Sequence, residues 1–298
     1  MQDTLETLRE IYGIQTEEQF KDYENKAKIL LTTGIRPSSD KTLVIVGGQP
    51  GAGKSRLIGP TNVELKNNAV IVDFDELRAL HPSYKTVSIN YPETTYKILQ
   101  ADIDNLKNRI LQFLIDNEYN VIYEGALRNT EGFLELGNLF KKGNYNINMN
   151  IMAVPKLESY GSTLVRYAYA MLTERTPRWV EKAAHDESYE GVIRTVSAFR
   201  ERGLADNISV FIRSSESPKK IYSTDEKQFR DAILAIQYGR EIGRRNAVEN
   251  FRDKYNFVKQ ILEQRQPELI ERLDSWEDLY RQEAENFNLL KTSTQAQK

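Results

Sequence analysis

Short runs of consecutive apolar residues recur along the first two thirds of the chain, and longer amphipathic stretches separate them. Because these runs do not alternate apolar with polar positions, they are typical of strands that helices cover on both faces. Strands that alternate with helices form right-handed βαβ units within a doubly wound, mainly parallel sheet. We therefore predict an α/β fold. The predicted strands are 42–46, 69–72, 120–123, 147–154 and 208–212.

Apolar residues at helical spacing occupy the segments between these strands and both flanks of the chain. The predicted helices of the α/β part are 93–117, 130–142, 156–175 and 188–203. The last segment, from 224 to 293, is charged and helical and indicates two or three appended helices. Its apolar stripe between residues 251 and 273 indicates a packing face rather than a cofactor site. The expected boundaries are 1–40 for an N-terminal helical segment, 41–223 for the α/β domain and 224–298 for a C-terminal helical extension with a polar tail.

The composition excludes several classes of protein. The 298 residues include 41 Lys and Arg against 43 Asp and Glu, so we expect neither a nucleic-acid nor a membrane partner. The chain has no cysteine, which excludes disulfides, thiolate zinc sites and cysteine nucleophiles. No apolar run reaches the roughly 18 residues that a membrane span needs, and the N-terminus lacks the features of a signal peptide. A cytoplasmic protein is expected.

The first predicted strand leads directly into a glycine-rich pattern. Residues 42–46 precede Gly-x-x-x-x-Gly-Lys-Ser, and a helix is expected after it, which is the context of a P-loop. Glycines let the backbone curl so that its N–H groups converge on phosphate oxygens, and the positive end of the helix adds to the field. Lys54 is expected to reach the β- and γ-phosphates, and Ser55 to ligate Mg²⁺. The expected nucleotide-binding residues are Gly48, Gln49, Pro50, Gly51, Ala52, Gly53, Lys54 and Ser55.

Acidic residues follow the second predicted strand, where ligands bind in open α/β sheets. Asp73 and Asp75 share one face if the strand extends that far. Either could then accept a proton from an attacking hydroxyl or hold Mg²⁺ through water. The alternative for Asp75 is that it caps a short helix at 76–80.

A P-loop indicates a nucleotide but not the reaction. A small-molecule kinase, an NTPase coupled to motion or signalling, and a nucleotide-binding regulator all stay open. Motor-type ATPases more often place an Asp at the end of the neighbouring strand, whereas this chain has Glu124, which favours a kinase. Glu124 and Arg128 together suggest a pocket wall, although they could also form a simple ion pair.

Two arginines on or just after the helix 156–175 are candidates for a phosphate clamp. Arg166 and Arg178 could neutralise a transferring phosphoryl group through bidentate contacts. Surface ion pairs are the alternative for each. His81 and His185 lack metal-ligand spacing, and a structural role is expected for both.

Several motifs, taken in order and at their distances, resemble the zeta toxin family of epsilon/zeta-type toxin–antitoxin systems over about residues 41–213. The motifs are Gly47-Gly48-Gln49-Pro50-Gly51-Ala52-Gly53-Lys54-Ser55, Val72-Asp73-Phe74-Asp75, His81-Pro82, Glu124-Gly125, Ala153-Val154-Pro155-Lys156, Ser159-Tyr160-Gly161, Arg166-Tyr167 and Ala184-His185-Asp186. The resemblance implies a P-loop kinase fold and an ATP- and Mg²⁺-dependent kinase that phosphorylates the sugar 3-hydroxyl of UDP-N-acetylglucosamine.

The resemblance also implies a role for individual residues. Lys54 would contact ATP and Ser55 the Mg²⁺, while Asp75 falls on the position of the catalytic base. Arg166 and Arg178 fall on the arginines that stabilise the γ-phosphate. On the substrate side, the matching residues are Glu124 and Arg128.

One departure leaves the acceptor open. Asn108 occupies a position at which the family commonly has a substrate-binding Glu, and an amide lacks that charge. Another small hydroxyl compound is therefore the first alternative acceptor. The second alternative is a nucleotide-gated interaction protein without phosphotransfer. The family also implies a possible antitoxin partner, and the resemblance does not cover the helices of 224–293.

Overall fold

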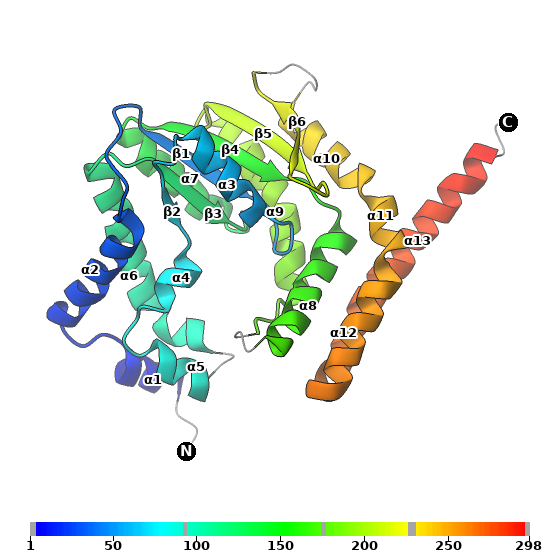
Figure 1. The fold of residues 1–298 in the computed structure, drawn as a ribbon, viewed down its shortest axis with the longest axis horizontal. Helices are drawn as coiled ribbons and strands as arrows, with labels where there is room; N and C mark the ends of the chain where they lie inside the picture. Colours follow the sequence, from blue (N-terminus) through cyan, green and yellow to red (C-terminus); the bar gives the residue numbers. More distant parts are fainter. Residues whose placement is uncertain (1–3, 92–93, 174–176, 226–230, 296–298) are drawn as a thin grey trace. The chain divides into compact units, whose positions relative to one another are not determined.

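The computed structural model describes residues 4–91, 94–173, 177–225 and 231–295. It contains a six-stranded sheet in the order β2-β3-β1-β4-β5-β6 (Figure 1). Strands β2 and β3 pair in parallel, as do β4 and β5, whereas β5 and β6 are antiparallel. The strands are β1 (Thr42–Gly47), β2 (Val70–Val72), β3 (Val121–Gly125), β4 (Asn146–Met152), β5 (Asn207–Ile212) and β6 (Lys219–Ser223). This mixed, mostly parallel sheet confirms the predicted α/β class.

Strand β6 was not predicted from the sequence. It begins with Lys219 and Lys220, both exposed, and only its last residues are buried. Lysines on an edge strand discourage pairing with another chain, and they also remove the apolar pattern that reveals a strand. The five predicted strands all form, with ends that differ by a few residues.

The described residues form two compact units, which we treat separately. Unit 1 comprises Met1–Leu43, Thr61–Glu124 and Lys142–Asn146, and unit 2 comprises Val44–Pro60, Gly125–Lys141 and Ile147–Lys298. The helices of unit 1 are α1 (Leu5–Tyr12), α2 (Glu17–Thr32), α4 (Phe74–Arg78), α5 (Tyr84–Asn90) and α6 (Thr95–Asp116). Those of unit 2 are α7 (Thr130–Lys142), α8 (Lys156–Leu172), α9 (Lys182–Glu201), α10 (Ala232–Ile242), α11 (Arg244–Glu249), α12 (Phe251–Arg265), the 3₁₀ helix η1 (Pro267–Leu273) and α13 (Asp274–Gln295).

Helix α6 organises the core of unit 1. Its buried residues recur every three or four positions from Ile98 to Leu114, which gives it one apolar face. Helices α1, α2 and α5 all contact α6. Thr4 and Thr16 begin α1 and α2 by accepting hydrogen bonds from the backbone N–H groups three residues ahead. The predicted N-terminal helical segment therefore consists of two capped helices.

In unit 2 the C-terminal helices pack on helix α8. Both α12 and α13 contact α8, and the three lie side by side (Figure 1). Trp276 is fully buried among Tyr160, Leu164 and Phe251 of this cluster. A Cβ on Gly161 would lie 2.5 Å from Cζ2 of Trp276, so the indole rests directly on the α8 backbone. The apolar stripe of the extension is a packing face, as predicted.

Helices α9 and α5 depart from the prediction. Helix α9 begins at Lys182, six residues before the predicted start at 188. The start was missed because the buried face of the first turns is polar and shows no apolar periodicity. Helix α5 has a single buried apolar residue, Val87, and was not predicted. Within the described residues, no helix is long and apolar enough to cross a bilayer.

Candidate nucleotide-binding site

The glycine-rich segment connects β1 to helix α3 (Ser55–Glu64), as the P-loop pattern predicts. Gly51 and Gly53 have φ angles of 73° and 89°, in the left-handed region that favours glycine. A Cβ on Gly51 would also collide with the backbone carbonyl of Ser159 in α8. The loop is therefore curled against α8, and a side chain at Gly51 would prevent this packing.

Two polar residues, Lys54 and Ser55, end the loop. Lys54 is half-buried, and its Nζ lies 3.4 Å from the carbonyl oxygen of Gln49, across the mouth of the loop. Ser55 is exposed and is the first residue of α3. The helix start directs unpaired N–H groups and its positive dipole end toward the loop, which makes the loop suitable for an anion.

The side chain of Gln49 attaches the loop to the segments behind it. Its side chain is fully buried, and its amide donates to the carbonyl oxygen of Val154 at 2.9 Å and to the hydroxyl of Ser159 at 3.1 Å. Its Oε1 atom has no hydrogen-bond partner among the described residues. The first, variable position of the loop is thus a structural link between the loop, the end of β4 and α8.

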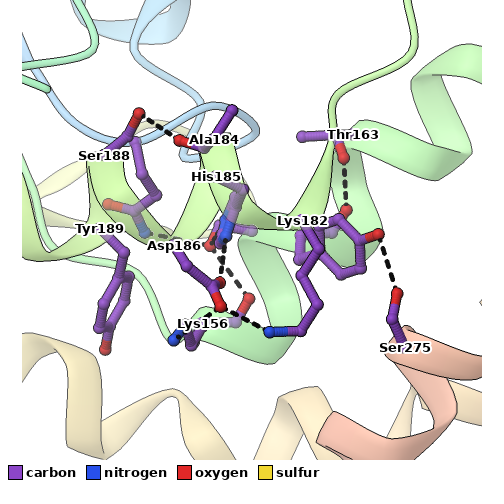
Figure 2. Close-up of polar contacts among 12 residues, drawn as sticks. Lys156, Thr163, Lys182, Ala184, His185, Asp186, Ser188, Tyr189 and Ser275 are labelled. Atoms are coloured by element: carbon purple, nitrogen blue, oxygen red, sulfur yellow. Dashed lines mark hydrogen bonds and ion pairs between the residues drawn. The ribbon is translucent and has the colours of Figure 1, made fainter.

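A polar chain extends from Ser159 into helix α9. The Ser159 hydroxyl lies 2.9 Å from Nε2 of His185, and Nδ1 of His185 lies 3.3 Å from a carboxylate oxygen of Asp186. Asp186 in turn accepts from Lys182 at 2.5 Å and pairs with Lys156 at 3.2 Å (Figure 2). This series of polar contacts connects Ser159, which supports the P-loop, to the start of α8 and the start of α9.

The order Ser159, His185, Asp186 resembles a nucleophilic triad, but its burial excludes that chemistry. Both Ser159 and His185 have 0% of their surface exposed, so no substrate reaches the hydroxyl. Burial lowers the pKa of His185 to about 4, despite the opposing effect of Asp186. The imidazole is therefore neutral near pH 7 and has a structural role, as expected.

Arg213, which was not among the predicted site residues, also supports the loop. It follows the carboxyl end of β5 and donates to the carbonyl oxygens of Gly51 and Ala52. The same guanidinium donates to Glu158 at 2.8 Å and to Ser162 at 3.0 Å. The signal for Arg213 was present, because it is a charged residue directly after a correctly predicted strand.

A second arginine binds the segment that follows Arg213. Arg56, in the first turn of α3, donates to the carbonyl oxygens of Ser214, Ser215 and Glu216. The turn after β5 is therefore attached to the same helix start that carries Ser55.

The three predicted arginines of unit 2 all have exposed side chains. Arg166 lies in α8 one helical turn beyond Ser162, on the face that contacts Arg213. Arg178 lies in the connection between α8 and α9. Arg128 pairs with Glu187 at 3.5 Å, with both side chains more than half exposed, so this pair contributes little stability.

In unit 1, Asp73 and Glu124 stand at the ends of neighbouring strands. Val72 pairs with Tyr123 in the parallel register of β2 and β3, and each acidic residue follows one member of that pair. Burial raises the pKa of Tyr123 to about 12, and the negative charge of Asp73 adds to the effect. Asp73 and Glu124 therefore lie side by side at the carboxyl end of this strand pair.

The expectations for Asp73 and Asp75 need a correction. Strand β2 ends at Val72 and α4 begins at Phe74, so Asp73 and Asp75 do not lie on one strand. The side chain of Asp75 lies outside the described part of the structure. Asp75 lies inside α4 and is not its cap. The backbone carbonyl of Asp73 accepts from the N–H groups of Glu76 and Leu77 at 3.2 and 3.3 Å and begins the helix.

Helix α6 places a basic residue near the carboxyl end of β3. Asn108, the predicted substrate-side residue, is exposed on α6. Its neighbour Lys107 was not predicted and lies 6.0 Å from the centre of the Tyr123 ring. A cation that faces the ring beside Asp73 could contact an anionic or hydroxyl-rich ligand. No pattern around Lys107 distinguishes it from other helix lysines, which is why the sequence did not indicate it.

His81 has a structural role in unit 1. Its Nε2 lies 3.1 Å from Asp102, and its Nδ1 accepts from the N–H of Ser83 at 3.1 Å. Asp102 also accepts from the N–H of Ile14 at 2.9 Å. His81 and Asp102 therefore link α6 to the segments that follow α1 and α4.

Comparison of the sequence with known proteins identifies its relatives. The sequence model of the zeta toxin family matches residues 27–227. Toxin zeta of Streptococcus agalactiae is 28% identical over 212 residues, which are 71% of this chain and 73% of that protein. Toxin PezT of Streptococcus pneumoniae is 25% identical over 199 residues, 66% of this chain and 79% of that protein.

Comparison of the structure points to the same fold. A solved structure of the PezAT chromosomal toxin–antitoxin system of Streptococcus pneumoniae matches with a TM-score of 0.72 and 21% identity, over 86% of this chain and 99% of that one. The AvrRxo1-ORF1:-ORF2 complex matches with a TM-score of 0.53 and 13% identity, over 83% and 82% of the two chains. The P-loop, its supporting helices and the extent of the family match lead to one conclusion: the chain belongs to the zeta toxin family.

Proposed function

We propose that the chain is an ATP-dependent kinase that transfers the γ-phosphate to the sugar 3-hydroxyl of UDP-N-acetylglucosamine. The observation that carries this proposal is the P-loop, which Gln49 holds from one side and Arg213 from the other. A loop fixed in this way can bind a triphosphate without reorganisation, and positioning supplies most of the catalysis in phosphoryl transfer.

Unit 2 contains the residues that would bind the donor. The loop N–H groups and Lys54 would hold the β- and γ-phosphates. Arg166 and Arg178 would neutralise the charge that develops on the transferred group, because their guanidinium groups can bind two phosphate oxygens at once.

The donor chemistry includes Mg²⁺, and the residues fit this ion. Mg²⁺ in such sites is usually held by substrate phosphates and few protein ligands. Among the described residues there is no group of three or more His, Cys, Asp or Glu that could hold a metal by itself. The exposed hydroxyl of Ser55 at the start of α3 would supply the protein ligand. When bound there, the ion would reduce the negative charge of the triphosphate during transfer.

The residues for the acceptor come mainly from unit 1. The acceptor hydroxyl oxygen would attack the γ-phosphorus as the bond from phosphorus to the β-phosphate oxygen breaks and ADP leaves. Asp75 would take the hydroxyl proton as general base. Glu124, Asn108 and Arg128 would hold the sugar nucleotide, and this assignment rests on the family resemblance of their positions.

The proposal is tested by an acceptor screen. Purified protein, ATP and Mg²⁺ are incubated with a panel of UDP-sugars, and the products are analysed for the mass gain of one phosphate. UDP-N-acetylglucosamine is expected to gain one phosphate, and the Lys54→Ala variant is expected to give no product. A panel without any phosphorylated sugar nucleotide, from folded protein that binds ATP, would contradict the proposal.

A different small hydroxyl acceptor is the second candidate. The observation that favours it is Asn108, which is exposed on α6 and lacks the charge that the family commonly has at this position. Nucleosides and hydroxyl-bearing antibiotics in the same screen separate the two candidates.

We also propose an antitoxin protein as partner, since the relative with the best structural overlap described above comes from a toxin–antitoxin system. Co-expression with any small open reading frame that lies next to the gene, followed by co-purification, tests this. A nucleotide-gated interaction protein without turnover would instead bind ATP and its partner but give no product in the screen.

A further inference from the structure

A second pocket in unit 2 lies among the C-terminal helices, with a volume of about 380 Å³. This is within the range of small-molecule sites. Its lining residues are Pro155, Lys156, Tyr189, Gln237, Arg240, Glu241, Arg244 and Glu283. The last five come from α10, α11 and α13, beyond residue 227, where the match to the zeta toxin family ends.

Arg240 is the feature of this pocket that needs an explanation. Its side chain is only 6% exposed, which is rare for an arginine. It donates to the carbonyl oxygen of Tyr189 at 2.5 Å and stacks 3.5 Å from the centre of the Tyr189 ring. Its Nε has no hydrogen-bond partner among the described residues. Burying a guanidinium is costly unless an anion pairs with it.

The carboxylates of the pocket do not supply that anion. Glu241 and Glu283 both bind Arg244, at 2.9 and 2.6 Å, and neither forms an ion pair with Arg240. Lys156, which also lines the pocket, pairs with Asp186 and lies 5.5 Å from the centre of the Tyr189 ring. Among the described residues, Arg240 therefore has no carboxylate within ion-pair distance, and Glu190 acts on it only through its charge.

We propose that this pocket binds a small molecule that carries a phosphate or carboxylate group, with Arg240 as the buried anchor and Lys156 and Arg244 at its sides. A guanidinium forms paired hydrogen bonds to either oxyanion. The pocket is separate from the P-loop in its residues, so this ligand is distinct from the nucleotide of the proposed kinase reaction.

The test needs a background in which the P-loop does not capture phosphate. In the Lys54→Ala variant, inorganic phosphate and citrate are titrated separately by calorimetry, and the thermal unfolding temperature is followed in parallel. At least one of the two anions is expected to bind and to raise the unfolding temperature by mass action. The anion that binds with the higher affinity identifies the oxyanion, phosphate or carboxylate, that the pocket prefers.

Arg240→Met in the same background is expected to weaken that binding by about tenfold or more, because a charge-assisted contact is lost. Arg240→Lys should recover part of the affinity. Arg245→Gln is the matched control, since Arg245 is exposed, lies outside the pocket and pairs with Glu249. It should bind as the parent does.

If Arg240→Met does not fold, Arg244→Gln replaces it. This change leaves Glu241 and Glu283 uncompensated beside the site, so anion binding should again be lost. Equal affinity in the parent and in the folded Arg240 or Arg244 variants would overturn the proposal. If neither phosphate nor citrate binds, the proposal of a small-molecule anion site is also overturned. This holds even if an acidic peptide binds at the same place.

Discussion

The side-chain amide of Gln49 lies 3.1 Å from the hydroxyl of Ser159, and this buried contact joins the P-loop to helix α8. Ser159 also contacts His185 at 2.9 Å, so one hydroxyl connects the nucleotide loop to α9. The rigidity of the proposed donor site therefore depends on residues that would not touch the nucleotide.

Ser159→Ala should destabilise the protein by about 1–3 kcal/mol, since it leaves the Gln49 amide and the His185 ring with unmet hydrogen bonds in the interior. It should also weaken ATP binding, because the loop loses its support. Urea unfolding and nucleotide titration measure the two effects. Ser88→Ala is the control, since among the described residues the Ser88 hydroxyl bonds to the carbonyl of Lys85 in its own helix and to no other group. Equal stability of the two variants would contradict the role of Ser159.

His185 should make stability fall in acid. Burial lowers its pKa from 6.5 to about 4 in the folded protein. Between these two values the unfolded chain binds a proton that the folded chain does not, so the stabilisation is complete above about pH 6.5 and is lost as the pH falls toward 4. The loss should be on the order of 3 kcal/mol.

The measurement is the free energy of unfolding by urea across this pH range, for the parent protein and for His185→Gln. Glutamine can still bond to Ser159 but does not titrate. The variant should therefore show a smaller decrease in stability over the same range. An identical decrease in both proteins would assign the acid sensitivity to other groups.

Arg213→Ala should weaken ATP binding by about tenfold or more, because the carbonyl oxygens of Gly51 and Ala52 lose a charged donor. Arg213→Lys should recover little, since an ammonium cannot reach the loop carbonyls, Glu158 and Ser162 with the fork of a guanidinium. Nucleotide titration measures this. Arg202→Ala is the control, as Arg202 is more than half exposed and 4.0 Å from Glu131. Full recovery with lysine would show that only the charge matters.

Gly161→Ala should cost about 1–3 kcal/mol, because the added methyl group would overlap the indole of Trp276. Gly59→Ala is the matched control. A Cβ at Gly59 in α3 meets nothing within 4 Å, so this change should be neutral or stabilising. Urea unfolding of both variants measures the difference. A neutral Gly161→Ala would contradict the packing of α13 on α8. The C-terminal helices would then have to be regarded as a separate module.

Periodicity predicted the helices and strands whose buried faces are apolar. Helix 130–142 was predicted with the observed bounds, because its core positions are apolar residues at helical spacing. The start of α9 was missed because its buried face contains His185 and Ser188 instead of apolar residues. Strand β6 was missed for a related reason, since an edge strand with lysines has no apolar pattern.

For the candidate site, the sequence predicted the residues that belong to a recognisable motif and missed those that act through the backbone. The P-loop was found from its spacing. Arg213 could be noticed only as a charged residue after a predicted strand, because its contact with a loop carbonyl belongs to no motif. The Arg240 pocket could not be predicted, because residues as distant as Lys156 and Glu283 form it. Asp75 stays a predicted base, but it was expected on a strand face, and the strand ends at Val72.

The central claim, transfer of the γ-phosphate to UDP-N-acetylglucosamine with Asp75 as base, is tested most directly by one comparison. The rate of formation of the phosphorylated sugar nucleotide is measured for the parent protein and for Asp75→Asn, at ATP concentrations that saturate each. We predict that Asp75→Asn binds ATP as the parent does and forms product about 10² to 10⁴ times more slowly. Product formation at the parent rate would contradict Asp75 as the base, and no product from the ATP-bound parent would contradict the kinase itself.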